Sequence, residues 1–244
     1  MANIYKVGGC IRDKILGLDS KDIDFTFVCE HSQTVEQGWL EMKNWMLDRN
    51  FEIFLETADC FTIRAKFPKG DVNEGLVADF VMARKEVGYI EGTRRPILEI
   101  GTLADDLIRR DFTLNALAED INGKIIDLFG GIEDLKIGIL RTPMDANITM
   151  MDDPLRILRA LRFTITKDFT LSKDIWEAIQ QPNILKKLEQ TVSHERIREE
   201  LLKMFQFNTP RTFRLLMDVD EIIPGFLELI FKDRMWLQPT TRKI

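Results

Sequence analysis

The chain has 244 residues, 45% of them hydrophobic and 30% charged, and a formal net charge of −6. This composition is typical of a soluble globular protein, and the length suffices for one large or two modest domains, of which we expect two. No apolar run approaches the roughly 18–20 residues that a membrane span needs, and the N-terminus lacks the features of a secretory signal, so we expect a cytoplasmic protein without a membrane partner.

Cysteine and histidine usage narrows the possible chemistry. Cys10, Cys29 and Cys60 are widely spaced and form no CxxC pair, which argues against a disulfide framework and against a zinc site. His31 and His194 are the only histidines, which leaves little room for a catalytic triad. Acid and base chemistry must therefore rest on carboxylates.

The first half of the chain alternates strand-like and helix-like stretches. The apolar periodicity predicts strands at 4–9, 22–29, 51–57, 60–67 and 76–85, and helices at 10–18 and near 33–49. Trp39, Met42, Trp45 and Met46 have helical spacing, which indicates core packing. The pattern favours an α+β fold.

Three further stretches complete this half. The Gly- and charge-containing segment 86–101 is expected to be a mobile loop, and LADDLIRRDFTLNALAED, residues 103–120, is expected to be a helix. A strand at IIDLF ends at Gly130–Gly131, which we interpret as a turn or hinge. We place the domain boundary here, with domains at 1–134 and 135–244.

The second half is expected to be nearly all helical. Helices are predicted within 151–163, 172–181, 193–205 and 209–218, some with Ser, Thr or Asp in capping positions. Residues 1–134 carry 16 Lys and Arg against 25 Asp and Glu, a net charge of −9, whereas residues 135–244 carry 18 against 15, a net charge of +3. A polyanion such as RNA would therefore favour the second half.

The pair Asp22 and Asp24 is the strongest candidate for a metal site. Residues two apart in a strand point to the same face, so the two carboxylates converge and offer hard oxygen ligands that suit Mg²⁺. Gly8 and Gly9 precede the pair, and glycines let a backbone approach phosphate oxygens at the start of a helix. Such carboxylate pairs also occur by chance on surface strands, but the glycines and the apolar neighbours of the pair favour a metal site.

A second cluster lies on the predicted helix 153–163. At about 100° per residue, Ile157, Leu158 and Leu161 fall on one side. The opposite half carries the polar set Asp153, Arg156, Arg159 and Arg162. A solvated amphipathic face is one interpretation. Three arginines at steps of three, with one acid, favour instead a site for an anion.

These blocks, in this order, resemble a known family. GGCIRD followed by DIDFTFV, RRDFTLNA, IIDLFGGIEDL, DDPLRILRALRF and SHERIREELLKM resemble successive motifs of the class II tRNA nucleotidyltransferases (CCA-adding enzymes) and their bacterial poly(A) polymerase relatives. The resemblance runs from about residue 4 to 205. It implies an α+β fold, with a polymerase β-like nucleotidyltransferase head built on a mixed sheet, followed by an all-helical neck and partial body.

The resemblance also implies residue roles. It makes Asp22 and Asp24 the catalytic metal ligands for Mg²⁺. Asp79 corresponds to a further catalytic carboxylate of relatives, or is a plain strand acid. The nucleotide-binding positions that it implies are Gly8, Gly9, Arg12, Arg110, Asp153, Arg156, Arg159 and Arg162. Asp153 and Arg156 would face the Watson–Crick edge of the incoming base, and Asp111 is expected to be structural, at a helix start.

The implied function is template-independent addition of CCA, or part of it, to the 3′ end of tRNA from CTP and ATP, with pyrophosphate release by a two-metal mechanism. Poly(A) addition to other RNA by the same chemistry is an alternative, and a non-enzymatic RNA-binding derivative is another. Family members usually continue into further RNA-gripping helices, so the chain is expected to be a minimal form, an incomplete protein or an enzyme for a smaller RNA. No obligate protein partner is evident.

Overall fold

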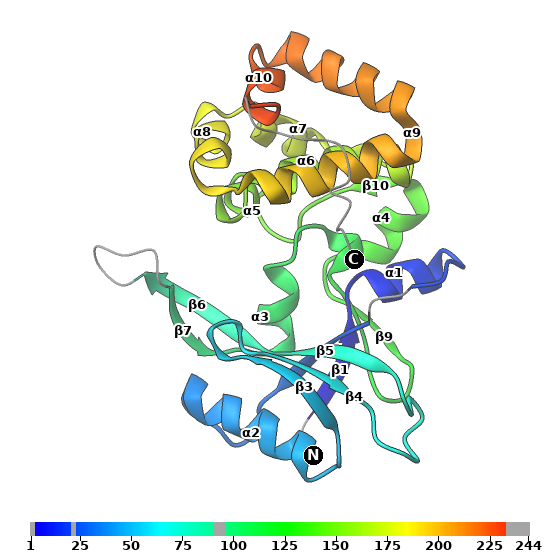
Figure 1. Ribbon diagram of the computed structural model, residues 1–244, viewed down its shortest axis with the longest axis vertical. Coiled ribbons are helices and arrows are strands. Elements are labelled where there is room, and N and C mark those ends of the chain that lie inside the picture. Colours follow the sequence, from blue (N-terminus) through cyan, green and yellow to red (C-terminus); the bar gives the residue numbers. More distant parts are fainter. Residues whose placement is uncertain (1–2, 21–22, 90–95, 233–244) are drawn as a thin grey trace, which may run out of the picture. The chain divides into compact units, whose positions relative to one another are not determined.

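The computed structural model describes residues 3–20, 23–89 and 96–232 (Figure 1). The chain divides into two compact units, a first unit of residues 1–133 and a second unit of residues 134–244. None of the helices within the described ranges is long and apolar enough to cross a membrane.

The first unit is built on a seven-stranded mixed sheet of order β3-β4-β5-β2-β1-β8-β9. Its strands are β1 (Asn3–Val7), β2 (Asp24–Val28), β3 (Glu52–Thr57), β4 (Thr62–Lys66), β5 (Val77–Met82), β8 (Leu117–Glu119) and β9 (Ile125–Asp127). Only β2 and β5 pair in parallel, and the other neighbours in this sheet are antiparallel. The strands expected in this half are confirmed, with shorter bounds.

Helix α2 (Val35–Leu47) covers one face of this sheet, and α3 (Leu103–Ile108) lies on the other (Figure 1). Thr34 begins α2 with a capping box, in which its side chain accepts from the Gln37 N–H and the Gln37 side chain accepts from the Thr34 N–H. The core under α2 consists of large apolar and aromatic side chains: Phe25, Phe27, Met42, Met46, Phe51, Ile63, Phe67, Phe80 and Met82. Trp39 and Trp45 pack against it, as their spacing predicted.

The expectation of a loop at 86–101 is wrong for its described part. Strands β6 (Arg84–Tyr89) and β7 (Pro96–Ile100) pair as an antiparallel hairpin, and residues 90–95 lie outside the described residues. Gly101 follows β7, and a Cβ there would lie 2.6 Å from the Arg84 carbonyl carbon. The glycine that suggested a loop therefore allows close backbone packing instead.

The expected helix at 103–120 is also wrong beyond its first turns. Helix α3 ends at Ile108, and a 3₁₀ turn η2 (Thr113–Asn115) leads into β8. Phe112, Leu114, Ala116 and Ala118 are fully buried. All residues from 111 to 119 are buried, and β8 pairs with β1 and β9, so this tertiary pairing prevails over the helix propensity of the segment. Asp111 consequently lies between α3 and η2 and not at a helix start.

Gly130 and Gly131 form the turn into α4 (Gly131–Ile137). Gly130 has φ +75°, and a Cβ on Gly131 would lie 2.2 Å from the Thr113 carbonyl oxygen. The Asp127 carboxylate accepts from the backbone N–H groups of Gly131 and Ile132. The turn is thus fixed by close packing and side-chain hydrogen bonds.

In its described residues, which end at Lys232, the second unit is helical except for one short parallel pair of strands, β10 (Ile139–Leu140) and β11 (Thr170–Leu171). After α4 its helices are α5 (Ala146–Asp152), α6 (Arg156–Thr166), α7 (Lys173–Ile179), α8 (Pro182–Thr191), α9 (His194–Ile222) and α10 (Phe226–Ile230). The small sheet is a minor departure from the all-helical expectation. Helix α9 contains the two helices expected at 193–205 and 209–218, separated by the non-helical residue Asn208.

Asp153 does not lie on the helix that was expected to carry it. Its φ of −137° and ψ of 97° are extended, and it follows the end of α5. Pro154 favours an extended conformation for the residue before it, so α6 begins only at Arg156. The buried side of α6 is as predicted, because Ile157, Leu158 and Leu161 are fully buried.

We predict that the three cysteines differ in reactivity. Burial raises the pKa of Cys10 and raises the pKa of Cys29 to about 12, so both thiols stay neutral and unreactive near neutral pH. Cys60 is exposed. Iodoacetamide at about pH 8 should therefore label Cys60 first, and all three only after unfolding, as measured by peptide mass spectrometry. Equal labelling of Cys29 and Cys60 in the folded protein would contradict the assigned burial.

Candidate functional site

Strand β2 carries the first part of the site. Asp24 and Thr26 point to the face opposite Phe25 and Phe27, because side chains alternate along a strand. Asp24 is the register partner of Asp79 on the parallel neighbour β5. Adjacent strands lie about 4.8 Å apart, so these two carboxylates stand side by side on one face of the sheet.

Asp79 has a second neighbour across the sheet. Arg64 on β4 is its register partner on the other side, and Arg64 Nε lies 3.4 Å from Asp79 Oδ1. The side chain of Asp79 is 34% exposed and that of Arg64 is 52% exposed. An ion pair this exposed is weak, so Arg64 holds Asp79 without excluding another cation from it.

The predicted partner of Asp24, Asp22, lies outside the described residues. Among the residues that are described, no group of three or more His, Cys, Asp or Glu side chains is arranged to hold a metal ion. The row of Asp24 and Asp79 does offer two hard oxygen donors, and Mg²⁺ in nucleotide sites uses one or two carboxylates together with substrate phosphates. The described residues therefore fit a magnesium site in their donor chemistry.

The glycine pair forms the turn between β1 and α1 (Gly9–Ile15). Gly8 has φ +82°, and a Cβ there would lie 2.8 Å from Arg110 Nη1. A Cβ on Gly9 would lie 3.2 Å from Arg12 Nη2. The two glycines thus let two guanidinium groups approach the turn. Helix α1 has only seven residues, so we attribute the positive charge here to the arginines and not to the helix.

Arg110 is held from α3 and from the sheet. Its Nη2 donates to Asp106 Oδ2 at 2.9 Å, and the Thr26 hydroxyl donates to the same oxygen at 2.8 Å. The side chain of Asp106 is only 7% exposed. A buried carboxylate with these two donors fixes the direction of the guanidinium, which is what a phosphate-binding arginine needs.

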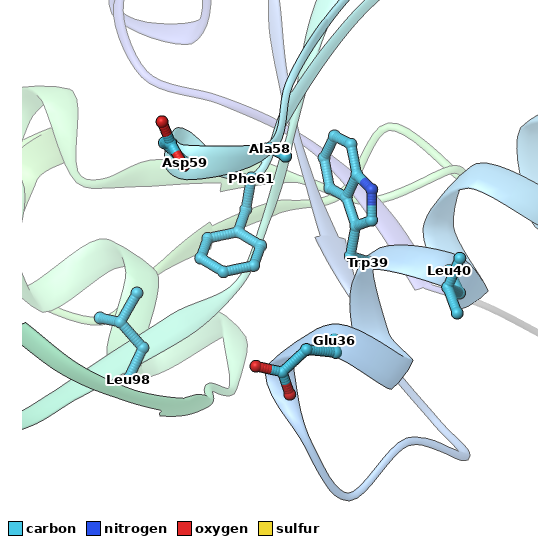
Figure 2. Close-up of a pocket in the computed structure, with 7 residues that line it drawn as sticks. All are labelled: Glu36, Trp39, Leu40, Ala58, Asp59, Phe61 and Leu98. Carbon is cyan, nitrogen blue, oxygen red and sulfur yellow. The ribbon is translucent and has the colours of Figure 1, made fainter.

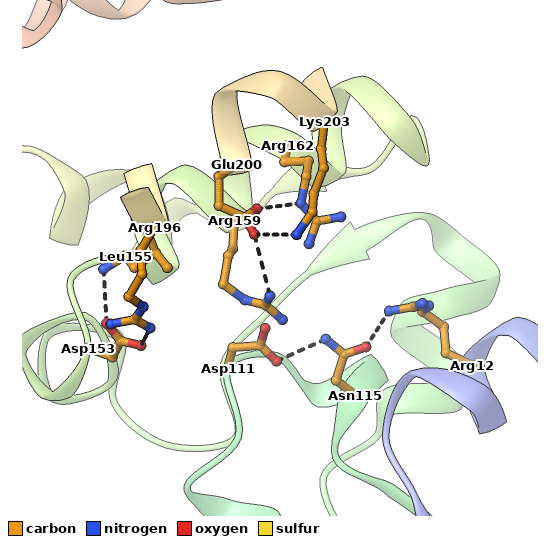
Figure 3. Close-up of polar contacts among 10 residues, drawn as sticks. All are labelled: Arg12, Asp111, Asn115, Asp153, Leu155, Arg159, Arg162, Arg196, Glu200 and Lys203. Atoms are coloured by element: carbon orange, nitrogen blue, oxygen red, sulfur yellow. Dashed lines mark hydrogen bonds and ion pairs between the residues drawn. The ribbon is translucent and has the colours of Figure 1, made fainter. Parts of the chain in front are cut away.

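Arg12 is held in a similar way, by Asp13 and by Asn115, and Figure 3 shows its contact with Asn115. Its Nε and Nη2 donate to the carboxylate of Asp13 at 2.9 and 2.7 Å, and its Nη1 donates to Asn115 Oδ1 at 2.6 Å. Asn115 Nδ2 in turn donates to Asp111 Oδ1 at 2.9 Å. Asp111 is 8% exposed, so its expected structural role fits this network.

The arginines of α6 surround a carboxylate of their own unit (Figure 3). Arg162 Nε donates to Glu200 Oε2 at 2.5 Å, and Arg159 Nη1 lies 3.8 Å from Glu200 Oε1. Lys203 Nζ lies 3.3 Å from the same Oε1. The side chain of Glu200 is 4% exposed. The like charges on α6 are therefore offset by this glutamate, which weakens the argument that their spacing alone requires a bound anion.

Asp153 and Arg156 are also engaged. The Asp153 carboxylate pairs with Arg196 of α9 at 2.7 Å and accepts from the Leu155 N–H at 3.2 Å. Arg156 Nη1 donates to the Thr149 carbonyl at 3.1 Å. Both side chains are oriented by neighbours, although only Arg156 lies on α6.

Two family models match the chain. The first is described as the poly(A) polymerase head domain and matches residues 4–141. The second is described as the probable RNA- and SrmB-binding site of polymerase A and matches residues 168–229. The chain belongs to the poly(A) polymerase head-domain family.

Individual relatives agree with this assignment. The chain is 34% identical over 231 residues to the CCA-adding enzyme of Lactobacillus helveticus. This alignment covers 91% of this chain and 51% of that protein. A structure of the Thermotoga maritima CCA-adding enzyme complexed with tRNA superposes with a TM-score of 0.68 at 28% identity, covering 93% of this chain and 48% of that one. For the Bacillus stearothermophilus CCA-adding enzyme in complex with CTP the TM-score is 0.69 at 28% identity, with coverages of 88% and 47%.

The chain thus spans about half the length of these relatives. The α+β head with a mixed sheet, expected from the motifs, is confirmed by the family and by these superpositions.

A hollow of about 790 Å³ lies elsewhere in the head, on the side of the sheet that α2 covers (Figure 2). Trp39, Phe61 and Leu98 line it, together with the carboxylate-bearing Glu36 and Asp59. No residue of the predicted site lines this hollow in the described structure. The negative charges of these two carboxylates would repel a triphosphate, so we do not assign the nucleotide to this hollow.

Several residues of the networks were missed from the sequence: Thr26, Asp106, Asn115, Arg196 and Glu200. Glu200 carried a usable signal. Ile197, Leu201 and Met204 are buried positions of α9, and Glu200 lies between them on the same helical stripe. An acid within an apolar stripe implies a buried cationic partner. Asp106 also carried a local signal, because Arg110 follows it by four residues, the spacing at which a carboxylate and an arginine can pair. Asn115 carried no signal for its contact with Arg12, which lies 103 residues away in the chain.

We predict that Glu200 stabilises the second unit. Glu200→Gln removes the charge that offsets Arg159 and Arg162, and hydrogen bonds to charged groups contribute about 1.5–3 kcal/mol each. The free energy of unfolding in urea should therefore fall by about 2 kcal/mol. The adjacent, exposed Glu199→Gln is the matched control and should leave the midpoint nearly unchanged. Equal midpoints for the two variants would contradict the network.

Proposed function

We propose that this chain is the head and adjoining helical region of a tRNA nucleotidyltransferase, which adds C and A residues to the 3′ end of tRNA from CTP and ATP. The observation that carries the proposal is the row of Asp24 and Asp79 on the sheet face that also bears Thr26, the hydroxyl that anchors Asp106 and Arg110. Relatives named CCA-adding enzymes, one of them in a structure with tRNA and one with CTP, support the substrates.

In this proposal the head binds the metal and the triphosphate. Asp22 and Asp24, with Asp79, would hold Mg²⁺. Bound there, magnesium would supply Lewis-acid chemistry: a lower pKa for an attacking hydroxyl and charge stabilisation for a pyrophosphate leaving group, as in a two-metal mechanism. Arg110 and Arg12 supply the positive charge that attracts the phosphates. Their carboxylate and amide partners fix these guanidiniums before the nucleotide binds, so little reorganisation remains to be paid at the reaction step.

The second unit, in the same proposal, chooses the base. Arg156 and Asp153 present a donor and an acceptor, which is the complement that a Watson–Crick edge needs. Arg159 and Arg162 add positive charge for the nucleotide, and Glu200 keeps them in place. Since side chains replace a nucleic-acid template, the fixed fork of arginine matters more here than its charge.

Poly(A) addition uses the same residues and is the competing function. The decisive assay supplies tRNA that ends before CCA, Mg²⁺ and single labelled nucleotides, and then sequences the extended 3′ ends. We expect incorporation of C, then A. Oligo(A) on any RNA would select the polymerase function, and no incorporation with folded protein would reject enzymatic transfer by this chain.

We predict that the proposed metal ligands Asp22 and Asp24 are essential for transfer. Asp22→Asn and Asp24→Asn should each lower the rate at least about 100-fold, because metal stabilisation of the transition state amounts to several kcal/mol. The exposed Asp19→Asn is a matched loss of one carboxylate and should retain activity. Thermal unfolding without metal should give similar midpoints for all three variants, whereas Mg²⁺ should stabilise only the Asp19 variant and the parent. Normal turnover in the Asp22 and Asp24 variants would reject the metal assignment.

We predict that Arg156 sets nucleotide choice. Arg156→Lys keeps the charge but loses the fork, and a good bidentate contact contributes about 1–3 kcal/mol of base discrimination. Incorporation of G and U relative to C and A should therefore rise roughly 10-fold. Lys186→Gln, an exposed change on α8, should leave the ratio unchanged. The measurement is single-nucleotide competition, and an unaltered ratio in the Arg156 variant would reject its base-reading role.

A further inference from the structure

The second unit contains a groove that none of the candidate site residues lines. Its volume is about 480 Å³, within the roughly 300–1,000 Å³ range of ligand pockets. It lies where α7, the end of α6 and the second part of α9 meet, elements that Figure 1 shows in green, yellow and orange. Its walls combine apolar and charged side chains, of which the important ones are Phe169, Trp176, Arg211, Arg214, Leu215 and Asp218.

The break in α9 helps to form one side of the groove. Asn208 is non-helical, with φ −155° and ψ 93°, and its side-chain oxygen accepts from the Arg211 N–H at 3.0 Å. This hydrogen bond is an N-cap, so a new helical segment starts after Asn208 and runs to Ile222. Pro210 fits in its first turn, where no intrahelical N–H partner is needed. Arg211, in that first turn, therefore lines the groove beside the positive end of a helix.

The two arginines of the groove, Arg211 and Arg214, are only weakly held by other groups of the protein. Arg211 Nη2 donates to the Thr164 carbonyl at 2.8 Å and to Asp168 Oδ1 at 2.5 Å. The Asp168 side chain is 82% exposed, so solvent screens this ion pair. Within the described part of the chain, Arg214 makes no hydrogen bond or ion pair. The Arg214 guanidinium is thus available to an anion, and that of Arg211 is held by one backbone carbonyl and one exposed carboxylate.

We propose that this groove binds one nucleotide of single-stranded RNA, with the base stacked on Trp176 and its phosphate between Arg211 and Arg214. The inference rests on the proposed function, since it names a place for the RNA substrate. Aromatic stacking beside arginine is the usual means of binding a single strand without reading its sequence. Asp218 lies one turn beyond Arg214, and its negative charge would repel a second phosphate. This repulsion limits the site to one nucleotide.

The test measures the binding of a fluorescein-labelled RNA oligonucleotide, about eight residues long, to the full chain by anisotropy. Trp176→Leu should raise Kd about 10-fold, and Trp176→Phe, which keeps an aromatic face, should raise it less. Arg214→Gln should raise Kd several-fold and reduce the slope of log Kd against log salt concentration by about 0.7. Lys186→Gln is the charge-matched control on α8 and should change Kd less.

A variant in the opposite direction makes the test independent of misfolding. Asp168→Asn should lower Kd several-fold, because it releases Arg211 from its carboxylate. Asn tolerates the φ of +60° at this position, so the backbone should keep its conformation. Asp174→Asn, an exposed acid on α7 outside the groove lining, is its matched control. Tighter binding by the Asp168 variant alone supports the groove. Equal effects of the two Asn variants would overturn it, because general charge would then account for both.

An abasic oligonucleotide of the same length separates stacking from phosphate binding. It should bind more weakly than the RNA and should lose nothing further with Trp176→Leu. An equal loss on both oligonucleotides would overturn the stacking assignment.

Transfer assays keep this inference distinct from the proposed function. Trp176→Leu and Arg214→Gln should raise the KM for RNA, Asp168→Asn should lower it, and all three should leave kcat unchanged. If the chain transfers no nucleotide yet the binding series holds, the groove stands and the proposed function fails. If transfer is normal and none of the groove variants affects binding or KM, the groove fails and the proposed function stands.

Discussion

The alternation of side chains along β2 is the constraint on which the head depends. Phe25 and Phe27 must enter the core under α2, and so Asp24 and Thr26 are directed to the opposite face. A slip of one residue would place the carboxylate in the aromatic core, at a cost far above the stability of a domain unless the group became neutral. The same packing that stabilises the sheet therefore fixes the direction of the candidate metal ligand.

From this strand the organisation extends through carboxylates that hold arginines. Asp106 joins Thr26 to Arg110, Asp13 and Asn115 hold Arg12, and in the second unit Glu200 holds Arg159 and Arg162. In each network a mostly buried acceptor satisfies part of a guanidinium and fixes its plane. The arginines thus bring positive charge together while their guanidinium groups keep fixed orientations. Fixed orientations are needed to bind a highly charged nucleotide in one position.

The two proposals divide the work between different physical effects. The head would act by fixed charge on phosphates, where a displacement of a fraction of an ångström matters. The groove at Trp176 would act by stacking and screened charge, which tolerate any base. Its weakly held arginines, next to an exposed Asp168, contrast with Arg159 and Arg162, which pair with the buried Glu200. This difference in burial separates residues suited to chemistry from residues suited to a mobile, sequence-tolerant RNA strand.

The sequence by itself determined the family, the strands of the head, the helical second half and the apolar side of α6, because these follow from motif order and from periods of 2 and 3.6 residues. It mispredicted the segments where local and tertiary preferences conflict. Glycines at 86–101 suggested a loop, yet Gly101 packs closely against Arg84 and β6 and β7 form a hairpin. Good helix formers at 103–120 gave way, after α3, to a buried strand that pairs with β1 and β9.

The pairs Arg12–Asp13 and Asp106–Arg110 are local in the sequence, but only the tertiary structure decided the pairings between distant segments. Asp79 becomes the neighbour of Asp24 because β5 pairs in parallel with β2, and this strand order is not encoded in any local period. Glu200 offsets arginines that lie some 40 residues earlier in the chain because α6 and α9 pack together. The sequence shows the residue types, but partners such as Asp79 and Glu200 come from distant segments, and those contacts determine what each charge can do.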